Sequence, residues 1–208
     1  MIIVWDTETT GFPLWGSPSE HPDQPHICSI AWIPCTDNAE PMTQEPIYRL
    51  IKPEPYYSVM PAEAFGVHGL TIERLQDEGV ELAEVMDEFM TGVGECAYDV
   101  AFNRAFDARM IRIAQHRLLH PGDLLDWWQA RPGKCAMRPM VKVVGLPATE
   151  SMKQYKGLAK RNKTPTLTEV HQHLFGVPHE NAHGAAGDAE AARRIWQVHL
   201  SGGTARFI

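Results

Sequence analysis

The sequence predicts an α/β protein built on a mixed five-stranded sheet flanked by helices, and three observations lead to that prediction. Three strand-like apolar segments come first and are joined by short links, which favours an antiparallel meander. Further apolar strands then alternate with segments of helical periodicity. With 208 residues the chain has the size of a single domain, so we expect one domain over residues 1–208.

The first strand begins at once, because Ile2 to Trp5 form a β-branched and aromatic run typical of a buried strand. Asp6 and Glu8 follow two residues apart, and in an extended chain such side chains share one face. A carboxylate pair of this kind is often a solvated strand edge. On a core strand, however, the two charges repel unless a cation lies between them, and hard divalent ions prefer carboxylate oxygens.

The other strands follow from apolar runs between breaks. Residues 12–26 are rich in proline and predict a loop. Residues 27–33 and 47–51 predict the second and third strands, and 98–102 a buried fourth strand. A short fifth strand is expected over 124–128, where Trp127 and Trp128 cannot both be buried on one face of a strand.

Apolar residues at spacings of three and four predict the helices. They are expected over residues 61–65, 81–93, 103–118, 135–144, 166–175 and 189–200. Thr71 and Thr166 are placed to cap helices, the latter in a capping box with Glu169. Asn103 is a good helix cap too, which puts Asp107 in the first helical turn, close to the carboxyl end of the preceding strand.

The composition bounds the class of protein. A hydrophobic fraction of 44% is typical of a globular chain. No apolar run approaches the roughly 20 residues that span a membrane, and the N-terminus lacks the basic region of a signal peptide. The cysteines are widely spaced without a C-x-x-C pair, which predicts reduced thiols in a cytoplasm rather than disulfides or a zinc site. These are Cys28, Cys35, Cys96 and Cys135. Nor do His171, His173 and His179 form a convincing zinc set.

The charge is unevenly distributed. The whole chain carries −7, which argues against a protein coated in basic residues. Residues 131–163, however, contain nine basic residues and one acidic residue, so this segment carries +8 and leaves −15 for the rest. Such a basic face could steer a phosphate backbone, and a solvated helical face is the alternative.

Three short segments carry a resemblance to a known family. Residues 6–11 (DTETTG) resemble the first motif of the DEDDh family of 3′–5′ exonucleases. Residues 102–107 (FNRAFD) resemble its second motif, usually met as His-Asn-Ala-x-Phe-Asp, and His183-x-x-x-x-Asp188 resembles the third. Residues 67–71 (VHGLT) are similar to a segment common in the branch of polymerase proofreading subunits. Phe102 departs from the usual histidine and the loop after Gly11 is long, which bears on substrate preference rather than on metal ligands.

The resemblance implies an RNase H-like fold that holds two Mg²⁺ or Mn²⁺ ions on four acidic residues, Asp6, Glu8, Asp107 and Asp188. Two metals can generate a nucleophile from water and stabilise the leaving oxygen of a phosphodiester. His183 is the expected general base, because imidazole titrates near neutral pH. The residues expected to contact the terminal nucleotide are Thr9, Phe12, His68, Leu70 and Asn103, although for Asn103 helix capping is the favoured role.

The sequence thus predicts a 3′–5′ exonuclease that acts on single-stranded 3′ ends, DNA rather than RNA, and releases nucleoside 5′-monophosphates. One alternative is an RNA-trimming or oligoribonucleotide-degrading enzyme with the same site. Another is a nucleic-acid-binding or polymerase-associated module without catalysis, which gives no reason to keep the four acids and His183. A proofreading role would require a polymerase partner on another chain.

Overall fold

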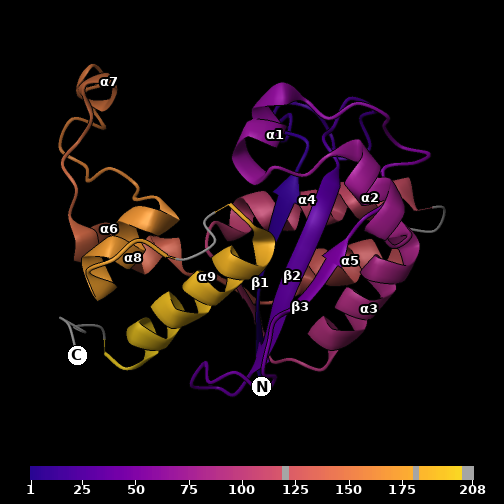
Figure 1. Cartoon of the computed structure of the whole chain (residues 1–208). Coiled ribbons are helices and arrows are strands. Elements are labelled where there is room, and N and C mark those ends of the chain that lie inside the picture. Colours follow the sequence, from indigo (N-terminus) through magenta and orange to yellow (C-terminus); the bar gives the residue numbers. More distant parts are fainter. Residues whose placement is uncertain (119–121, 180–182, 203–208) are drawn as a thin grey trace.

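The computed structural model describes residues 1–118, 122–179 and 183–202, which form a sheet with helices on both faces (Figure 1). The strands are β1 Ile2–Thr9, β2 Ile27–Cys35, β3 Ile47–Leu50, β4 Asp99–Ala101 and β5 Gly133–Cys135. The helices are α1 Ala62–His68, α2 Ile72–Glu78, α3 Leu82–Gly94, α4 Arg104–Arg117, α5 Gly122–Ala130, α6 Met137–Val144, α7 Glu150–Lys153, α8 Leu167–Phe175 and α9 Ala185–Leu200.

The sheet has five strands in the order β3-β2-β1-β4-β5, so the predicted mixed sheet is confirmed and β1 is its central strand. β1 pairs antiparallel with β2, and β2 pairs antiparallel with β3. On its other side β1 pairs parallel with β4, which pairs parallel with β5. The carboxyl ends of β1 and β4 therefore lie at the same edge of the sheet, where α4 begins.

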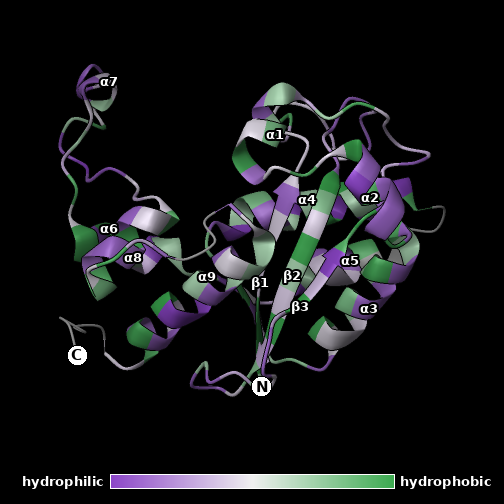
Figure 2. Ribbon diagram, viewed as in Figure 1, coloured by the Kyte–Doolittle hydropathy of each residue, from purple (hydrophilic) through white to green (hydrophobic). Residues whose placement is uncertain are grey.

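Side chains of β1 alternate between two cores. Ile3 and Trp5 pack on the side of α3, α4 and α5, whereas Ile2 and Val4 pack on the side of α6, α8 and α9. All four are fully buried, and burying a side chain of this size stabilises a fold by about 1.5–3 kcal/mol. Figure 2 shows hydrophobic residues along β1 and β2 beneath α9. The same alternation places the two acidic residues of β1 on the α9 face.

Two of the three predicted helix caps form as expected. The hydroxyl of Thr71 accepts the Arg74 N–H at the start of α2, and Thr166 and Glu169 form a capping box on α8. Asn103 occupies the N-cap position of α4, but its side chain makes no capping hydrogen bond. Its backbone carbonyl accepts the first helical N–H instead, so the prediction of side-chain capping is wrong and the exposed amide stays available.

The fifth strand is not where the sequence suggests. Residues 124–128 belong to helix α5, and the edge strand is β5, the short segment Gly133–Cys135. Trp128 is 2% exposed and packs edge-on against Trp5, while Trp127 is 37% exposed. A helix buries one of two adjacent tryptophans as readily as a strand does. A three-residue edge strand without a fully buried side chain carries no apolar pattern, and it also delays the start of α6 to Met137.

The segment between α6 and α8 extends away from the sheet and carries the short helix α7 (Figure 1). Lys156, Lys160 and Arg161 lie on it with exposed side chains, and within the described ranges none of them forms an ion pair. Figure 2 shows this segment, residues 145–166, to be largely hydrophilic. We call it the basic arm. Among the helices that the structure describes, none is long and apolar enough to cross a membrane.

Candidate active site

Three of the predicted metal ligands converge beside the central strand. Asp6 and Glu8 come from β1, and Asp188 comes from the first turn of α9, which crosses the same face of the sheet. One carboxylate oxygen from each of the three lies within 4.8 Å of the others. Small residues at the start of α9, Ala185 and Ala189, are fully buried and let the helix approach the strand closely.

The fourth predicted ligand, Asp107, reaches the site from the opposite face of the sheet. It lies in the first turn of α4 and is 3% exposed. The hydroxyl of Thr7 donates a hydrogen bond to its Oδ1 at 2.8 Å. Thr7 points to the α4 face because its neighbours Asp6 and Glu8 point to the α9 face. Asp107 thus stands next to the cluster of three without being one of its members.

Burial and mutual repulsion raise the pKa values of these acids. Burial, followed by the nearby Asp188 and Asp107, raises the pKa of Glu8 to about 8. Burial also raises the pKa of Asp6, with Asp107 the next cause. For Asp107, burial outweighs the hydrogen bonds from Thr7 and raises the pKa to about 7. Buried carboxylates that repel one another are offset by a divalent cation, and an all-oxygen donor set suits Mg²⁺ or Mn²⁺.

The predicted general base, His183, lies beside Asp188 through its backbone. Its N–H donates to Asp188 Oδ1 at 3.3 Å, while its side chain is exposed to solvent. Its φ of 67° is a left-handed conformation that residues other than glycine seldom adopt. Strained backbone of this kind is characteristic of functional sites. The structure therefore places the His183 backbone next to Asp188 and leaves its side chain exposed to solvent.

A second histidine, which the sequence did not single out for this role, contacts the acid cluster directly. His179 Nε2 lies 2.7 Å from Asp188 Oδ1, and the His179 side chain is only 4% exposed. Because an ionised carboxylate only accepts hydrogen bonds, the ring nitrogen is the donor. Asp188 Oδ1 thus receives hydrogen bonds from two residues, which leaves Oδ2 for a metal. No motif spacing marks His179, since it stands outside the helix that carries Asp188.

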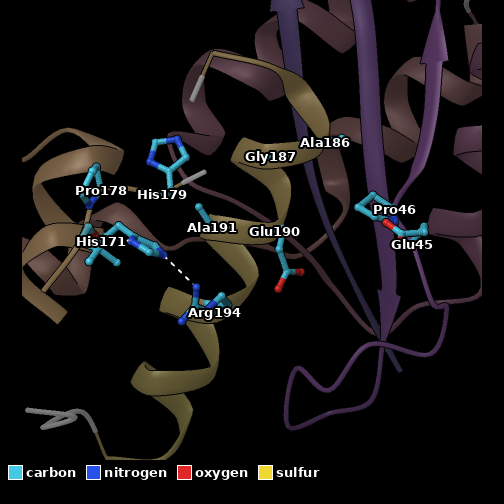
Figure 3. Close-up of a pocket in the computed structure, with 11 residues that line it drawn as sticks. Glu45, Pro46, His171, Pro178, His179, Ala186, Gly187, Glu190, Ala191 and Arg194 are labelled. Atoms are coloured by element: carbon cyan, nitrogen blue, oxygen red, sulfur yellow. Dashed lines mark hydrogen bonds between the residues drawn. The ribbon is translucent and has the colours of Figure 1, made fainter. Parts of the chain in front are cut away.

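His179 also borders a hollow of about 510 Å³ behind the acid cluster, between α8, α9 and the residues before β3 (Figure 3). On the wall of this hollow, Arg194 donates to His171 Nε2 at 3.2 Å, and His171 Nδ1 lies 2.8 Å from the Val177 carbonyl. The guanidinium of Arg194 lies 4.2 Å from the centre of the Phe175 ring. Both ring nitrogens of His171 thus have partners on the wall of the hollow, whereas His179 makes its hydrogen bond to Asp188, the candidate metal ligand.

The two predicted nucleotide contacts at the end of β1 differ in whether the side chain is available to bind a nucleotide. Phe12 is 83% exposed and meets Phe106 edge-on, with ring centres 5.9 Å apart. The hydroxyl of Thr9 donates to the Gly11 carbonyl at 2.8 Å, so it shapes the start of the loop. Phe12 therefore offers an open ring face, while the Thr9 hydroxyl already has a partner.

Two other predicted contacts, His68 and Leu70, lie at the end of α1 and just after it. Leu70 is buried with Cys28, Leu50 and Leu75 in a small core. Its N–H donates to Nδ1 of His68 at 3.0 Å. Burial lowers the pKa of His68, and its buried Nε2 makes no hydrogen bond to any residue that the structure describes. His68 is thus held through Nδ1, its Nε2 is buried without a hydrogen bond among the described residues, and Leu70 is a core residue.

Comparisons with known proteins identify the family and the fold of the chain. A sequence model of the exonuclease family RNase_T matches residues 3–196. The structure of E. coli Exonuclease I with a dT13 oligonucleotide aligns with a TM-score of 0.71 and 18% identity, over 95% of this chain and 40% of that chain. A product-bound structure of exonuclease I gives a TM-score of 0.68 and 17% identity, over 96% and 42%.

This chain therefore spans about two fifths of the length of the Exonuclease I chains that it matches. At this identity the likeness establishes the fold, which is the predicted RNase H-like one. The comparison with curated protein sequences gives no match. The family model covers nearly the whole chain, including all four predicted acidic ligands, and this chain accordingly belongs to the RNase_T family of exonucleases.

Proposed function

We propose that this chain is a metal-dependent exonuclease that hydrolyses the phosphodiester bond at the 3′ end of single-stranded DNA and releases nucleoside 5′-monophosphates. The observation that carries the proposal is the convergence of Asp6, Glu8 and Asp188 within 4.8 Å. Membership of an exonuclease family supports the class of reaction. The Exonuclease I structure that contains dT13 supports single-stranded DNA as the substrate.

The acidic residues Asp6, Glu8, Asp107 and Asp188 would hold two Mg²⁺ or Mn²⁺ ions. When bound, the ions provide a hydroxide-like nucleophile at neutral pH and offset the charge on the leaving 3′ oxygen. The chain supplies a dry, rigid setting for this chemistry. Asp6 and Glu8 are fixed by the central strand, Asp107 is held by the Thr7 hydroxyl, and Asp188 is held by His179.

His183 would take the proton from the attacking water. In support of this role, its side chain is exposed to solvent and its backbone N–H donates to Asp188. Gly184, the N-cap of α9, follows His183 directly and gives the backbone there the freedom to reorient the ring once substrate is bound. Phe12 would stack on a base of the strand, an interaction worth about 1–3 kcal/mol in single-strand binders. The exposed Asn103 amide and His68 Nε2 would contact the terminal nucleotide.

The test is a degradation assay with matched oligonucleotides. Single-stranded DNA and RNA of the same sequence, labelled at the 5′ or the 3′ end, are incubated with Mg²⁺ or with EDTA. The proposal expects 5′-labelled DNA to give a ladder that shortens from the 3′ end, with 5′-monophosphates as products and no reaction in EDTA. A ladder that shortens from the 5′ end would overturn the polarity, and faster degradation of RNA would favour the RNA-trimming alternative.

A further inference from the structure

A second hollow lies at the opposite end of α9 from the acid cluster. It has a volume of about 480 Å³ and sits beside β5, the edge strand of the sheet. Trp196 on its wall follows Asp188 by eight residues on α9, so the two are roughly 12 Å apart along the helix axis. The other walls come from the start of α4, from β5 and from the first turn of α6. This hollow is therefore distinct from the proposed metal site.

The polar side chains around this hollow are hydrogen-bond donors with positive or neutral charge. Lys134 and Arg138 line it, and neither forms an ion pair with any residue in the described ranges. Trp196 is 5% exposed, and its Nε1 makes no hydrogen bond to the described part of the chain. An indole N–H can only donate, and a buried donor without an acceptor is costly. Among the residues that the structure describes, no aspartate or glutamate lines the hollow.

At the base of the hollow, the charge of Arg104 is already neutralised by an ion pair. Arg104 donates twice to the fully buried Asp99, from Nε at 2.6 Å and from the terminal guanidinium nitrogen at 2.9 Å. Gly133 makes room for this guanidinium, because a Cβ at that position would lie 1.8 Å from Arg104 Nε. Asp99 thus balances the charge of Arg104, whereas Lys134 and Arg138 have no acidic partner among the described residues.

We propose that this hollow binds a phosphate group, and that in the working protein the phosphate belongs to the backbone of the bound nucleic-acid strand, on the 5′ side of the hydrolysed end. Two cations without an ion pair among the described residues, beside a hollow that no described acidic side chain lines, match the chemistry of a phosphate oxyanion. They are conspicuous on a chain with a net charge of −7. The identity of the strand rests on the proposed exonuclease function, whereas binding of the phosphate group does not.

The phosphate site itself is tested with inorganic phosphate on the intact chain. The indole N–H resonance of Trp196, assigned with Trp196→Phe, is followed by NMR during titration with phosphate and, separately, with chloride at equal ionic strength. We expect a saturable shift with phosphate that Arg138→Gln removes. Lys142→Gln is the matched control, because it removes the same charge from the exposed part of α6 outside the hollow. An unsaturable shift, or an equal response in the two variants, would overturn the site.

The strand is tested by oligonucleotide binding in EDTA, where no hydrolysis occurs. Lys134→Gln and Arg138→Gln should each weaken binding of a long single strand about tenfold, the effect of one lost charge-assisted hydrogen bond. Each should also reduce the slope of log K against log salt by about 0.7, as expected for one lost phosphate contact. Hydrolysis of a mononucleotide ester, too short to reach the hollow, should stay at the wild-type rate.

The outcomes separate the two proposals. Phosphate binding with unchanged oligonucleotide affinity would overturn the assignment to the strand. Loss of mononucleotide ester hydrolysis in both variants would show that the hollow acts through the metal site and would equally overturn it. Absence of hydrolysis in the wild-type chain would count against the exonuclease function and leave the NMR result for inorganic phosphate standing by itself.

Discussion

At the scale of single residues, the geometry around Asp188 explains how a carboxylate on a helix is held ready for a metal. His179 donates to one oxygen from a buried position, and the backbone of His183 donates to the same oxygen. The two histidines thus differ: the His179 side chain is buried and holds Asp188, whereas the His183 side chain is exposed to solvent. Sequence motifs identify His183 through its five-residue spacing from Asp188. They miss His179, because its contact depends on how α8 and α9 pack and not on a spacing within one element.

His179 can be tested as a positioning residue. Replacing it with alanine should weaken Mn²⁺ binding about 10–100-fold, the usual range for a lost partner of a metal ligand. His179→Gln keeps an N–H donor and should restore most of the affinity. Calorimetric titration of Mn²⁺ measures both variants without turnover, and the melting temperature serves as the control for folding. Equal losses in the two variants would assign His179 to packing alone.

His183 has a different signature. His183→Ala should lower kcat by about 10²–10⁴, the range for a lost general base, while Mn²⁺ binding stays close to that of the wild type because the backbone N–H is retained. Single-turnover hydrolysis of a labelled oligonucleotide measures the rate. A normal rate in this variant would mean that another group takes the proton from the water.

At the scale of elements, three segments distant in sequence meet at one edge of the sheet. β1 was predictable because its apolar run is long and its acidic residues alternate, and the helices that bring Asp107 and Asp188 were predictable from periodicity. β5 was not, because Gly133–Cys135 has no hydrophobic pattern and derives its conformation from pairing with β4. Pairing with β4 thus determines the conformation of β5, which the local sequence does not indicate. The apolar pair Trp127 and Trp128 gave a stronger pattern, but it belongs to helix α5 and not to a strand.

The basic arm is a separate element with its own prediction. Reversing the charges of Lys156, Lys160 and Arg161 to glutamate should weaken single-strand binding and flatten its salt dependence, because these side chains are exposed and have no acidic partner among the described residues. Lys153 and Lys163 already pair with Glu150 and Glu169, so their reversal to glutamate, compared per unit of charge removed, is the control. An unchanged salt slope in the triple variant would make the arm a solvated surface.

At the scale of the whole molecule, the acid cluster lowers the stability of the fold, although the proposed function needs it. Without a cation the buried carboxylates repel one another. Their raised pKa values reflect the free energy that burial and this repulsion cost. A local excess of positive charge lies elsewhere, on the segment from 131 to 163, where it can attract a phosphate backbone without neutralising the acids. Composition predicted this division, although only the structure separates the basic arm from the hollow beside β5.

This loss of stability predicts the pH dependence of folding. In metal-free protein the pKa values of Glu8 and Asp107, raised by burial to about 8 and about 7, exceed those of the unfolded chain. Between about pH 4 and pH 8 these two acids therefore bind more protons in the native state, and their contribution to the free energy of unfolding falls as pH rises, by at most about 1.4 kcal/mol per pH unit for each group. Burial lowers the pKa of His26 to about 4, which opposes this fall below about pH 6.5, so the fall is clearest from pH 6.5 to pH 8. Thermal melting in EDTA should show this fall.

Two comparisons sharpen that measurement. Glu8→Gln, which removes one of the buried acids, should make the fall with pH shallower. Saturating Mg²⁺ should raise the melting temperature more at pH 8 than at pH 5, because binding favours the ionised carboxylates. A melting temperature in EDTA that stays constant from pH 5 to pH 8 would contradict the assignment of buried, mutually repelling acids.

The central claim is that acids from distant segments form one cation site that serves hydrolysis. Its most direct test is calorimetric titration of Mn²⁺ into the wild type and into Asp6→Ala, with oligonucleotide hydrolysis measured on the same samples. The account predicts that the wild type binds two Mn²⁺ per chain, and that Asp6→Ala loses tight binding and hydrolysis together without a lower melting temperature in EDTA. Wild-type Mn²⁺ affinity or wild-type hydrolysis in Asp6→Ala would contradict it.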